Sequence, residues 1–199
     1  MTFTGTLLPY QPEAVDRMVE RRKMLVAYDL GLGKTVLTIA AIERLKDEGK
    51  ITGPGLIICL SSLKYQWATQ IEKFTDGSAN VIVIDGTPKK REQQYLEAID
   101  WGHTLVDYVI LNYEQVVNDW DKVQQLNRSF VVVDEATAIK SFNVCILLPG
   151  VTAITVLAVA MGPTISRSLI GSKPLFGWFS LLNKLVPVAM IRILLVPVF

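Results

Sequence analysis

The sequence of 199 residues is poor in the side chains that build disulfide frameworks and zinc sites. It contains two cysteines, Cys59 and Cys145, and one histidine, His103. Two cysteines cannot form the disulfide framework of a small secreted scaffold. A single histidine leaves no credible zinc site and no Ser-His-Asp or Cys-His arrangement for nucleophilic catalysis. The first residues lack a basic region followed by an apolar run, which excludes a secretory signal peptide.

Acidic residues are absent from one end of the sequence. All 19 of them lie in residues 1–142, whereas residues 143–199 carry only four charged side chains, all basic. The first part therefore has a net charge of −3 and the second of +4, although the whole chain is at +1. This break predicts a domain over 1–142 and an apolar tail over 143–199. A chain that is 50% hydrophobic and nearly neutral is neither disordered nor a basic nucleic-acid-binding tail.

Within 1–142, short apolar runs alternate with helical patterns. The apolar runs predict strands at 24–28, 56–60, 81–84, 108–111 and 130–133. Helices are predicted at 11–22, 35–46, 63–74, 89–99 and 113–123. Strands without polar alternation are typical of a parallel sheet that is covered on both faces. The predicted fold class is therefore α/β, with a mostly parallel sheet flanked by helices.

A glycine-containing turn joins the first predicted strand to the next helix. Its sequence is Asp29-Leu30-Gly31-Leu32-Gly33-Lys34-Thr35. Glycines let the backbone approach phosphate oxygens, and N–H groups at a helix start attract an anion. Lys34 would then reach the β- and γ-phosphates of a nucleotide, and the Thr35 hydroxyl would bind Mg²⁺. The P-loop consensus is incomplete because Tyr28 stands at its first glycine, so the alternative is an ordinary glycine turn with a solvated lysine.

A second motif, Phe130-Val131-Val132-Val133-Asp134-Glu135, ends a predicted strand with two carboxylates. Asp134 would hold Mg²⁺ through water, and Glu135 would orient or activate the attacking water. The alternative is a strand end with two solvated acids. In a parallel sheet, however, the ends of both strands would meet at one edge, where ligands bind. Together the two motifs predict a site for ATP and Mg²⁺.

With these motifs in place, residues 1–142 resemble the first RecA-like lobe of the Swi/Snf-like family of superfamily-two helicases. Five segments carry the resemblance: 8–11, 29–35, 56–74, 109–114 and 134–140. The family form of the turn is D-x-G-x-G-K-T, which itself lacks the first glycine of the consensus. The resemblance implies an ATP-driven translocase on double-stranded DNA, with an ATP hydrolase activity. It also implies that Gln11 holds adenine and that the segment 56–74 contacts the DNA backbone.

Two positions depart from the family pattern. Leu60 stands where the family usually has proline, and Thr137 replaces the histidine that links the ATP site to the next motif. A net charge of −3 provides no electrostatic attraction for DNA, so the DNA partner rests on the resemblance. Trp67 is either a core aromatic residue or a residue near DNA. Lys64 and Lys73 are expected to be solvated.

The tail, residues 143–199, matches no motif of the family. In the family a second RecA-like lobe would follow, with an arginine for the transition state and half of the DNA groove. Three interpretations stay open: an out-of-frame or truncated segment, a membrane-associated segment with an uncharged stretch at 143–166, or a folded part that supplies a missing strand.

The functions that follow from these interpretations differ. A lobe that is truncated before its partner lobe would have little turnover by itself. A membrane-anchored ATP-binding module and a non-functional helicase fragment are the alternatives. The early position of the first family motif, at 8–11, predicts a bacterial or phage motor. Such a motor is expected in the cytoplasm, or at a membrane if the tail inserts.

Overall fold

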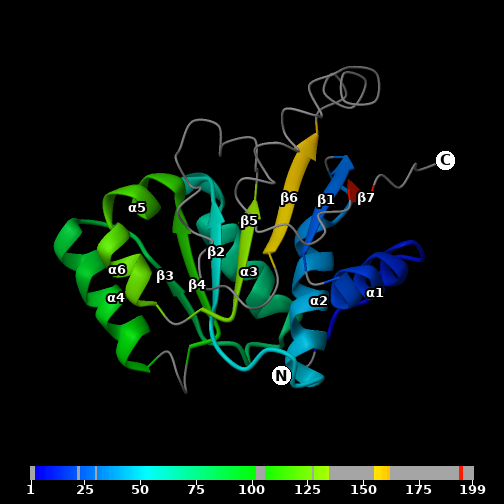
Figure 1. Ribbon diagram of the computed structural model, residues 1–199, viewed down its shortest axis with the longest axis horizontal. Coiled ribbons are helices and arrows are strands. Elements are labelled where there is room, and N and C mark those ends of the chain that lie inside the picture. Colours follow the sequence, from blue (N-terminus) through cyan, green and yellow to red (C-terminus); the bar gives the residue numbers. More distant parts are fainter. Residues whose placement is uncertain are drawn as a thin grey trace.

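The computed structural model describes residues 3–21, 23–29, 31–101, 106–126, 128–134, 155–161 and 193–194. Helices and strands alternate along most of the chain, which Figure 1 shows in sequence colours. The strands are β1 (Lys23–Asp29), β2 (Gly55–Cys59), β3 (Val81–Val83), β4 (Tyr108–Asn112), β5 (Phe130–Asp134), β6 (Thr155–Met161) and β7 (Ile193–Leu194). The helices are α1 (Gln11–Arg21), α2 (Lys34–Asp47), η1 (Ser61–Leu63), α3 (Lys64–Phe74), α4 (Pro88–Trp101), α5 (Tyr113–Asn118) and α6 (Trp120–Gln125).

The strands form one seven-stranded sheet with the order β3-β4-β2-β5-β6-β1-β7 (Figure 1). Every pairing described in this sheet is parallel. Parallel neighbours require crossover connections, and in this chain most of these connections contain helices. The predicted α/β class with a mostly parallel sheet is therefore confirmed. Its consequence for the site is that β1 and β5 end at the same edge of the sheet.

Strand β6 lies between β5 and β1 and connects the N-terminal part of the sheet to the rest. Asp134 of β5 is opposite Ala158 of β6, which is opposite Val26 of β1. The seven residues of β6 belong to the predicted tail, and this pairing is what the folded interpretation of the tail expects for them. Apart from β6 and β7, the tail lies outside the described residues, and the boundary at 142 stays a prediction. No described helix is long and apolar enough to cross a membrane.

Side chains along the central strands point alternately into two cores. On β5, Phe130 and Val132 pack with α1, α2 and α3, whereas Val131 and Val133 pack with α4, α5 and α6. This alternation follows from the two-residue period of a strand. Because helices cover both faces, both sets of side chains are apolar, which explains the uninterrupted apolar runs of the sequence.

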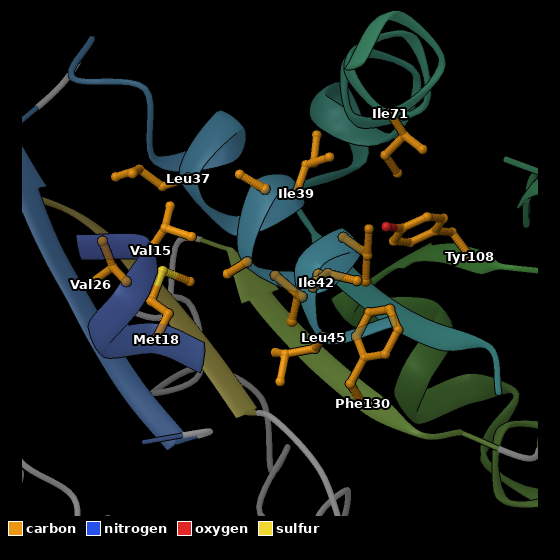
Figure 2. Packing of buried hydrophobic residues seen from close by; sticks show 14 of the residues in the cluster. Val15, Met18, Val26, Leu37, Ile39, Ile42, Leu45, Ile71, Tyr108 and Phe130 are labelled. Atoms are coloured by element: carbon orange, nitrogen blue, oxygen red, sulfur yellow. The ribbon is translucent and has the colours of Figure 1, made fainter. Parts of the chain in front are cut away.

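The first of these cores fixes the start of α2. Figure 2 shows its side chains gathered between α1, α2 and the sheet. Helix α1 buries Val15 and Met18, which are three residues apart and therefore share a face. Helix α2 is buried around much of its circumference, through Leu37, Ile39, Ala41, Ile42 and Leu45. A helix held this firmly gives the preceding turn a rigid attachment point.

One predicted helix differs from the structure. The helix expected over 113–123 is divided into α5 and α6 at Asp119, whose φ of −110° and ψ of 25° are not helical. The carboxylate of Asp119 accepts two hydrogen bonds from Arg91 of α4, at 2.7 and 2.9 Å. The prediction of one continuous helix is wrong because apolar periodicity does not record a polar partner on a distant element.

Candidate nucleotide-binding site

The turn between β1 and α2 holds two glycines in the left-handed region of the backbone. Gly31 has a φ of +83° and Gly33 a φ of +72°, values that residues with a side chain rarely adopt. Gly33 is also the N-cap residue of α2, and no side-chain hydrogen bond caps the helix there. A helix start of this kind offers its first N–H groups to an anion.

Gln11 lies directly against this turn. It is the first residue of α1 and only 3% exposed. Its Nε2 donates to the carbonyl oxygen of Leu32 at 3.3 Å, and its Oε1 accepts from the N–H of Leu8 at 2.8 Å. A Cβ atom at Gly33 would stand 2.7 Å from Nε2, so this position has no room for a side chain unless Gln11 moves. The structure therefore brings together two sequence segments that are about twenty residues apart and that were predicted to share a ligand.

Lys34 and Thr35 are the first two residues of α2, and both are partly exposed. The N–H of Leu37 donates to the carbonyl oxygen of Gly33 at 3.0 Å, so regular helical bonding begins at the N-cap. Both side chains thus start from the end of α2 that faces the glycine turn. Their roles toward phosphate and Mg²⁺ stay predictions.

Asp134 ends β5 and is 9% exposed. Alternation along β5 places it on the same face as Phe130 and Val132, which is the face that α2 and α3 cover. Its Oδ2 accepts a hydrogen bond from the indole Nε1 of Trp67 on α3 at 2.8 Å. Its backbone carbonyl accepts a hydrogen bond from the hydroxyl of Tyr113, the first residue of α5. One aromatic donor therefore holds the carboxylate of Asp134, and a second, on another helix, holds its backbone carbonyl.

A family of known proteins shares the sequence around this site. The SNF2-related domain family matches residues 10–148, a range that contains Gln11, the glycine turn and Asp134. The chain belongs to this family. Its resemblance to the Swi/Snf-like helicases is confirmed.

Two curated relatives illustrate the extent of the match. ATPase ISW1 of an ISWI chromatin-remodeling complex from Saccharomyces cerevisiae is 31% identical over 144 residues, which cover 69% of this chain and 12% of the relative. Helicase SWR1 from Debaryomyces hansenii is 31% identical over 144 residues, covering 70% and 9%. The chain spans about a tenth of the length of these relatives.

Solved structures support the RecA-like fold of the SNF2-related lobe. A SWI2/SNF2 ATPase core from Sulfolobus solfataricus in complex with dsDNA superposes with a TM-score of 0.70 and 23% identity, and covers 94% of this chain and 37% of that chain. A SWI2/SNF2 ATPase core domain from the same organism gives a TM-score of 0.63 and 22% identity, with coverages of 92% and 36%. At these identities the likeness establishes the fold.

Trp67 has a defined place in the SNF2-related lobe. It is 2% exposed and belongs to the core under α2 and α3. Of its two sequence interpretations, core packing is therefore correct, but the side chain also holds Asp134. The sequence indicates neither this bond nor the one from Tyr113. The sequence offers one signal for these bonds, which is position along the chain. Trp67 lies soon after β2, which pairs with β5, and Tyr113 directly follows β4, which pairs with β2.

The expectation that Lys64 is solvated is wrong. Lys64 is 1% exposed, and its Nζ donates to the carbonyl oxygen of Ile84 at 2.8 Å and to Oδ1 of Asp85 at 2.7 Å. Lys64, Trp67 and Ile71 are the buried residues of α3, and their spacing of three and four residues puts them on one helical face. Its position on this face buries the aliphatic part of the Lys64 side chain. The ammonium group donates hydrogen bonds to a carboxylate and a carbonyl just after β3. Lys73 is exposed, as expected.

Cys59 is fully buried at the end of β2, as expected of a small core residue. Burial, together with the nearby carboxylate of Asp134, raises the pKa of its thiol to about 12. The thiol is therefore protonated at neutral pH and unsuited to nucleophilic chemistry. The proposed water-orienting Glu135, together with Thr137, His103 and Cys145, lies outside the described residues.

The groups of this site fit ATP with Mg²⁺. The uncapped start of α2 beside two left-handed glycines matches the needs of a polyphosphate. A hydroxyl at Thr35 and a carboxylate at Asp134 are oxygen ligands of the kind that Mg²⁺ binds together with nucleotide phosphates. The oxygen ligands and the glycine turn are therefore both of the kind that a nucleotide with Mg²⁺ requires.

Proposed function

We propose that this chain is an ATP-binding lobe of an ATP-dependent DNA translocase of the SNF2 family. The observation that carries the proposal is the contact between Gln11 and the glycine turn, at 3.3 Å from Nε2 to the Leu32 carbonyl. This contact closes one side of the uncapped start of α2 with a carboxamide, a group suited to hydrogen bonding with adenine. Asp134 supplies a carboxylate at the same edge of the sheet.

Each residue has a distinct role in this proposal. The backbone N–H groups of 31–35 and the ammonium group of Lys34 bind the phosphates. Thr35 and Asp134 hold Mg²⁺, which neutralises charge on the phosphates when it is bound. Glu135 orients the attacking water. Gln11 selects the adenine ring.

Double-stranded DNA is the proposed partner. The relatives support this proposal, and so does the solved neighbour that contains dsDNA. The charge of residues 1–142 does not, since it is −3. We therefore propose that much of the DNA contact comes from a second RecA-like lobe, which would also supply the transition-state arginine.

Calorimetric titration of the full chain with a non-hydrolysable ATP analogue and Mg²⁺ tests the nucleotide site. We expect measurable binding that Lys34→Ala abolishes, because the ammonium group is the main fixed charge for the phosphates. Lys50→Ala is the matched control, since Lys50 lies beyond the opposite end of α2 and pairs with Glu48. Equal affinity in the wild type and Lys34→Ala would rule out the proposed phosphate site.

ATP hydrolysis with and without a DNA duplex tests the motor function. We expect slow hydrolysis by the chain alone, and stimulation by duplex DNA only when a second lobe of an SNF2-family protein is added. Strong stimulation of the chain alone would contradict the proposed need for a second lobe. No stimulation in either case, with intact ATP binding, would contradict the DNA partner.

A further inference from the structure

The hydrogen bond between Trp67 and Asp134 joins helix α3 to the proposed metal ligand. The indole Nε1 of Trp67 donates to Oδ2 of Asp134 at 2.8 Å, and both residues are buried, at 2% and 9% exposure. Core packing alone would be served by any large apolar side chain. A buried carboxylate, by contrast, needs a hydrogen-bond donor to compensate for lost water. Tryptophan is suited to this place because it combines an apolar body with one N–H donor.

The donor is itself held in a fixed position. Three residues earlier on α3, the buried Nζ of Lys64 donates to the Ile84 carbonyl and to Asp85. Helix α3 is therefore bonded to the sheet edge at two places, just after β3 through Lys64 and at the end of β5 through Trp67. The hydroxyl of Tyr113 fixes the backbone carbonyl of Asp134 from the opposite side of the sheet.

We propose that Trp67 is a positioning residue that sets the orientation of the Asp134 carboxylate for Mg²⁺. This inference rests on the proposed nucleotide function. Oδ2 is engaged by the indole, which limits rotation of the carboxylate about its last side-chain bond. A carboxylate accepts about four hydrogen bonds or metal contacts, so the bond from Trp67 does not by itself exclude a metal or its bound water. Groups that orient a metal ligand in this way typically contribute a factor of 10–100 to metal affinity.

The test compares Trp67→Phe with the wild-type full chain by calorimetric titration of a non-hydrolysable ATP analogue, with Mg²⁺ and with EDTA. Phenylalanine keeps an aromatic ring but removes the N–H donor. We expect affinity in EDTA to stay within about twofold, and the gain in affinity from Mg²⁺ to fall roughly tenfold. Trp120→Phe is the matched control, because Trp120 packs against the other core, which lies on the opposite face of the sheet from Trp67. A full Mg²⁺ gain in Trp67→Phe would overturn the proposal.

A spectroscopic measurement on the wild type keeps the proposal testable if Trp67→Phe does not fold. With ¹⁵N-labelled tryptophan, the indole N–H resonance of Trp67 reports its bond to Asp134. We expect this resonance to shift when Mg²⁺ is added to the nucleotide complex, whereas that of Trp120 stays in place. Trp101→Phe, Trp120→Phe and Trp178→Phe each remove one of the other three indole resonances, which leaves the fourth assigned to Trp67. An unmoved Trp67 resonance at saturating Mg²⁺ would overturn the positioning role.

The outcomes separate this inference from the proposed function. If the wild type binds no nucleotide, the proposed function fails, and the positioning role fails with it. If the wild type binds nucleotide with a clear Mg²⁺ gain that Trp67→Phe retains, only the positioning role fails.

Discussion

The Nε2 atom of Gln11 lies 2.7 Å from the place that a Cβ atom at Gly33 would occupy. The first turn of α1 therefore closes over the N-cap of α2, and the glycine serves two needs at once. Its φ of +72° requires a residue without a side chain, and the carboxamide above it requires the space.

We expect Gly33→Ala to weaken nucleotide binding far more than Gly31→Ala. Gly31 also has a positive φ, but no atom of the described residues lies within 4 Å of its missing Cβ. Both substitutions carry a backbone cost of about 1–2 kcal/mol, whereas only Gly33→Ala displaces Gln11. Calorimetric titration with the ATP analogue, together with thermal unfolding, measures both effects. Equal losses of affinity in the two variants would show that displacement of Gln11 does not matter.

A second prediction concerns how much the Lys64–Asp85 ion pair contributes to the stability of the fold in acid. The buried ammonium group of Lys64 and the hydroxyl of Tyr65 both donate to Asp85 and lower its pKa to about 2. The unfolded-state pKa is about 3.9. A carboxyl group with a lowered pKa in the folded state stabilises the fold above the unfolded value, and this contribution is lost as the pH falls from 4 toward 2.

We therefore expect Asp85→Asn to lower the free energy of unfolding at pH 7 and to flatten its decline between pH 4 and pH 2. Urea unfolding at several pH values in this range measures the slope. Asp76→Asn is the control, since Asp76 is an exposed acid in the turn after α3, and asparagine tolerates its φ of 52°. An unchanged slope in Asp85→Asn would contradict the lowered pKa of Asp85 in the folded protein.

The sheet and the glycine turn are predictable from the sequence because their signals are local. An apolar run such as Phe130–Val133 and a turn with Gly31 and Gly33 express backbone requirements within a few residues. Strand β6 is different. Its residues 155–161 are apolar like other central strands, but they lie in a tail that is apolar nearly throughout. Periodicity cannot distinguish such a strand from a membrane segment, and only its two neighbours in the sheet define it.

The connections around Asp134 were not predictable because they depend on which strands are neighbours. Trp67 and Asp134 are 67 positions apart and meet because β2 and β5 pair, with Ile58 opposite Val133. The inward position of Lys64 has a helical signal, namely its spacing from Trp67. A lysine is nevertheless expected to be exposed, because the sequence does not show that the carboxylate of Asp85, in a loop 21 residues away, will bind it.

A third prediction concerns Gly55, the first residue of β2. Gly55 is opposite Phe130 in the register of β2 with β5, and a Cβ atom there would overlap the Phe130 ring. We expect Gly55→Ala to destabilise the fold by about 1–3 kcal/mol, because the ring must leave a well-packed position beside Tyr108. Urea unfolding measures the change. Restoration by the double variant Gly55→Ala with Phe130→Leu would identify the ring as the cause, and a stability equal to the wild type in Gly55→Ala would refute it.

The last prediction compares two arginine–carboxylate pairs under the same substitution. Arg91 binds both oxygens of Asp119 from a largely buried position, with side-chain exposures of 16% and 12%. Arg17 pairs with Glu13 one turn away on α1, where both side chains are exposed. Lysine cannot reproduce the two-pronged bond of a guanidinium group.

Replacement by lysine should therefore cost more stability at position 91 than at position 17. We expect Arg91→Lys to lower the free energy of unfolding by about 1–2 kcal/mol, since a charge-assisted bond to a nearly buried carboxylate is lost. Arg17→Lys should change it by less than about 0.5 kcal/mol, as is usual for an exposed pair. Urea unfolding of both variants measures the difference. Similar values for the two would mean that the two-pronged bond from Arg91 to Asp119 adds no more stability than an exposed ion pair.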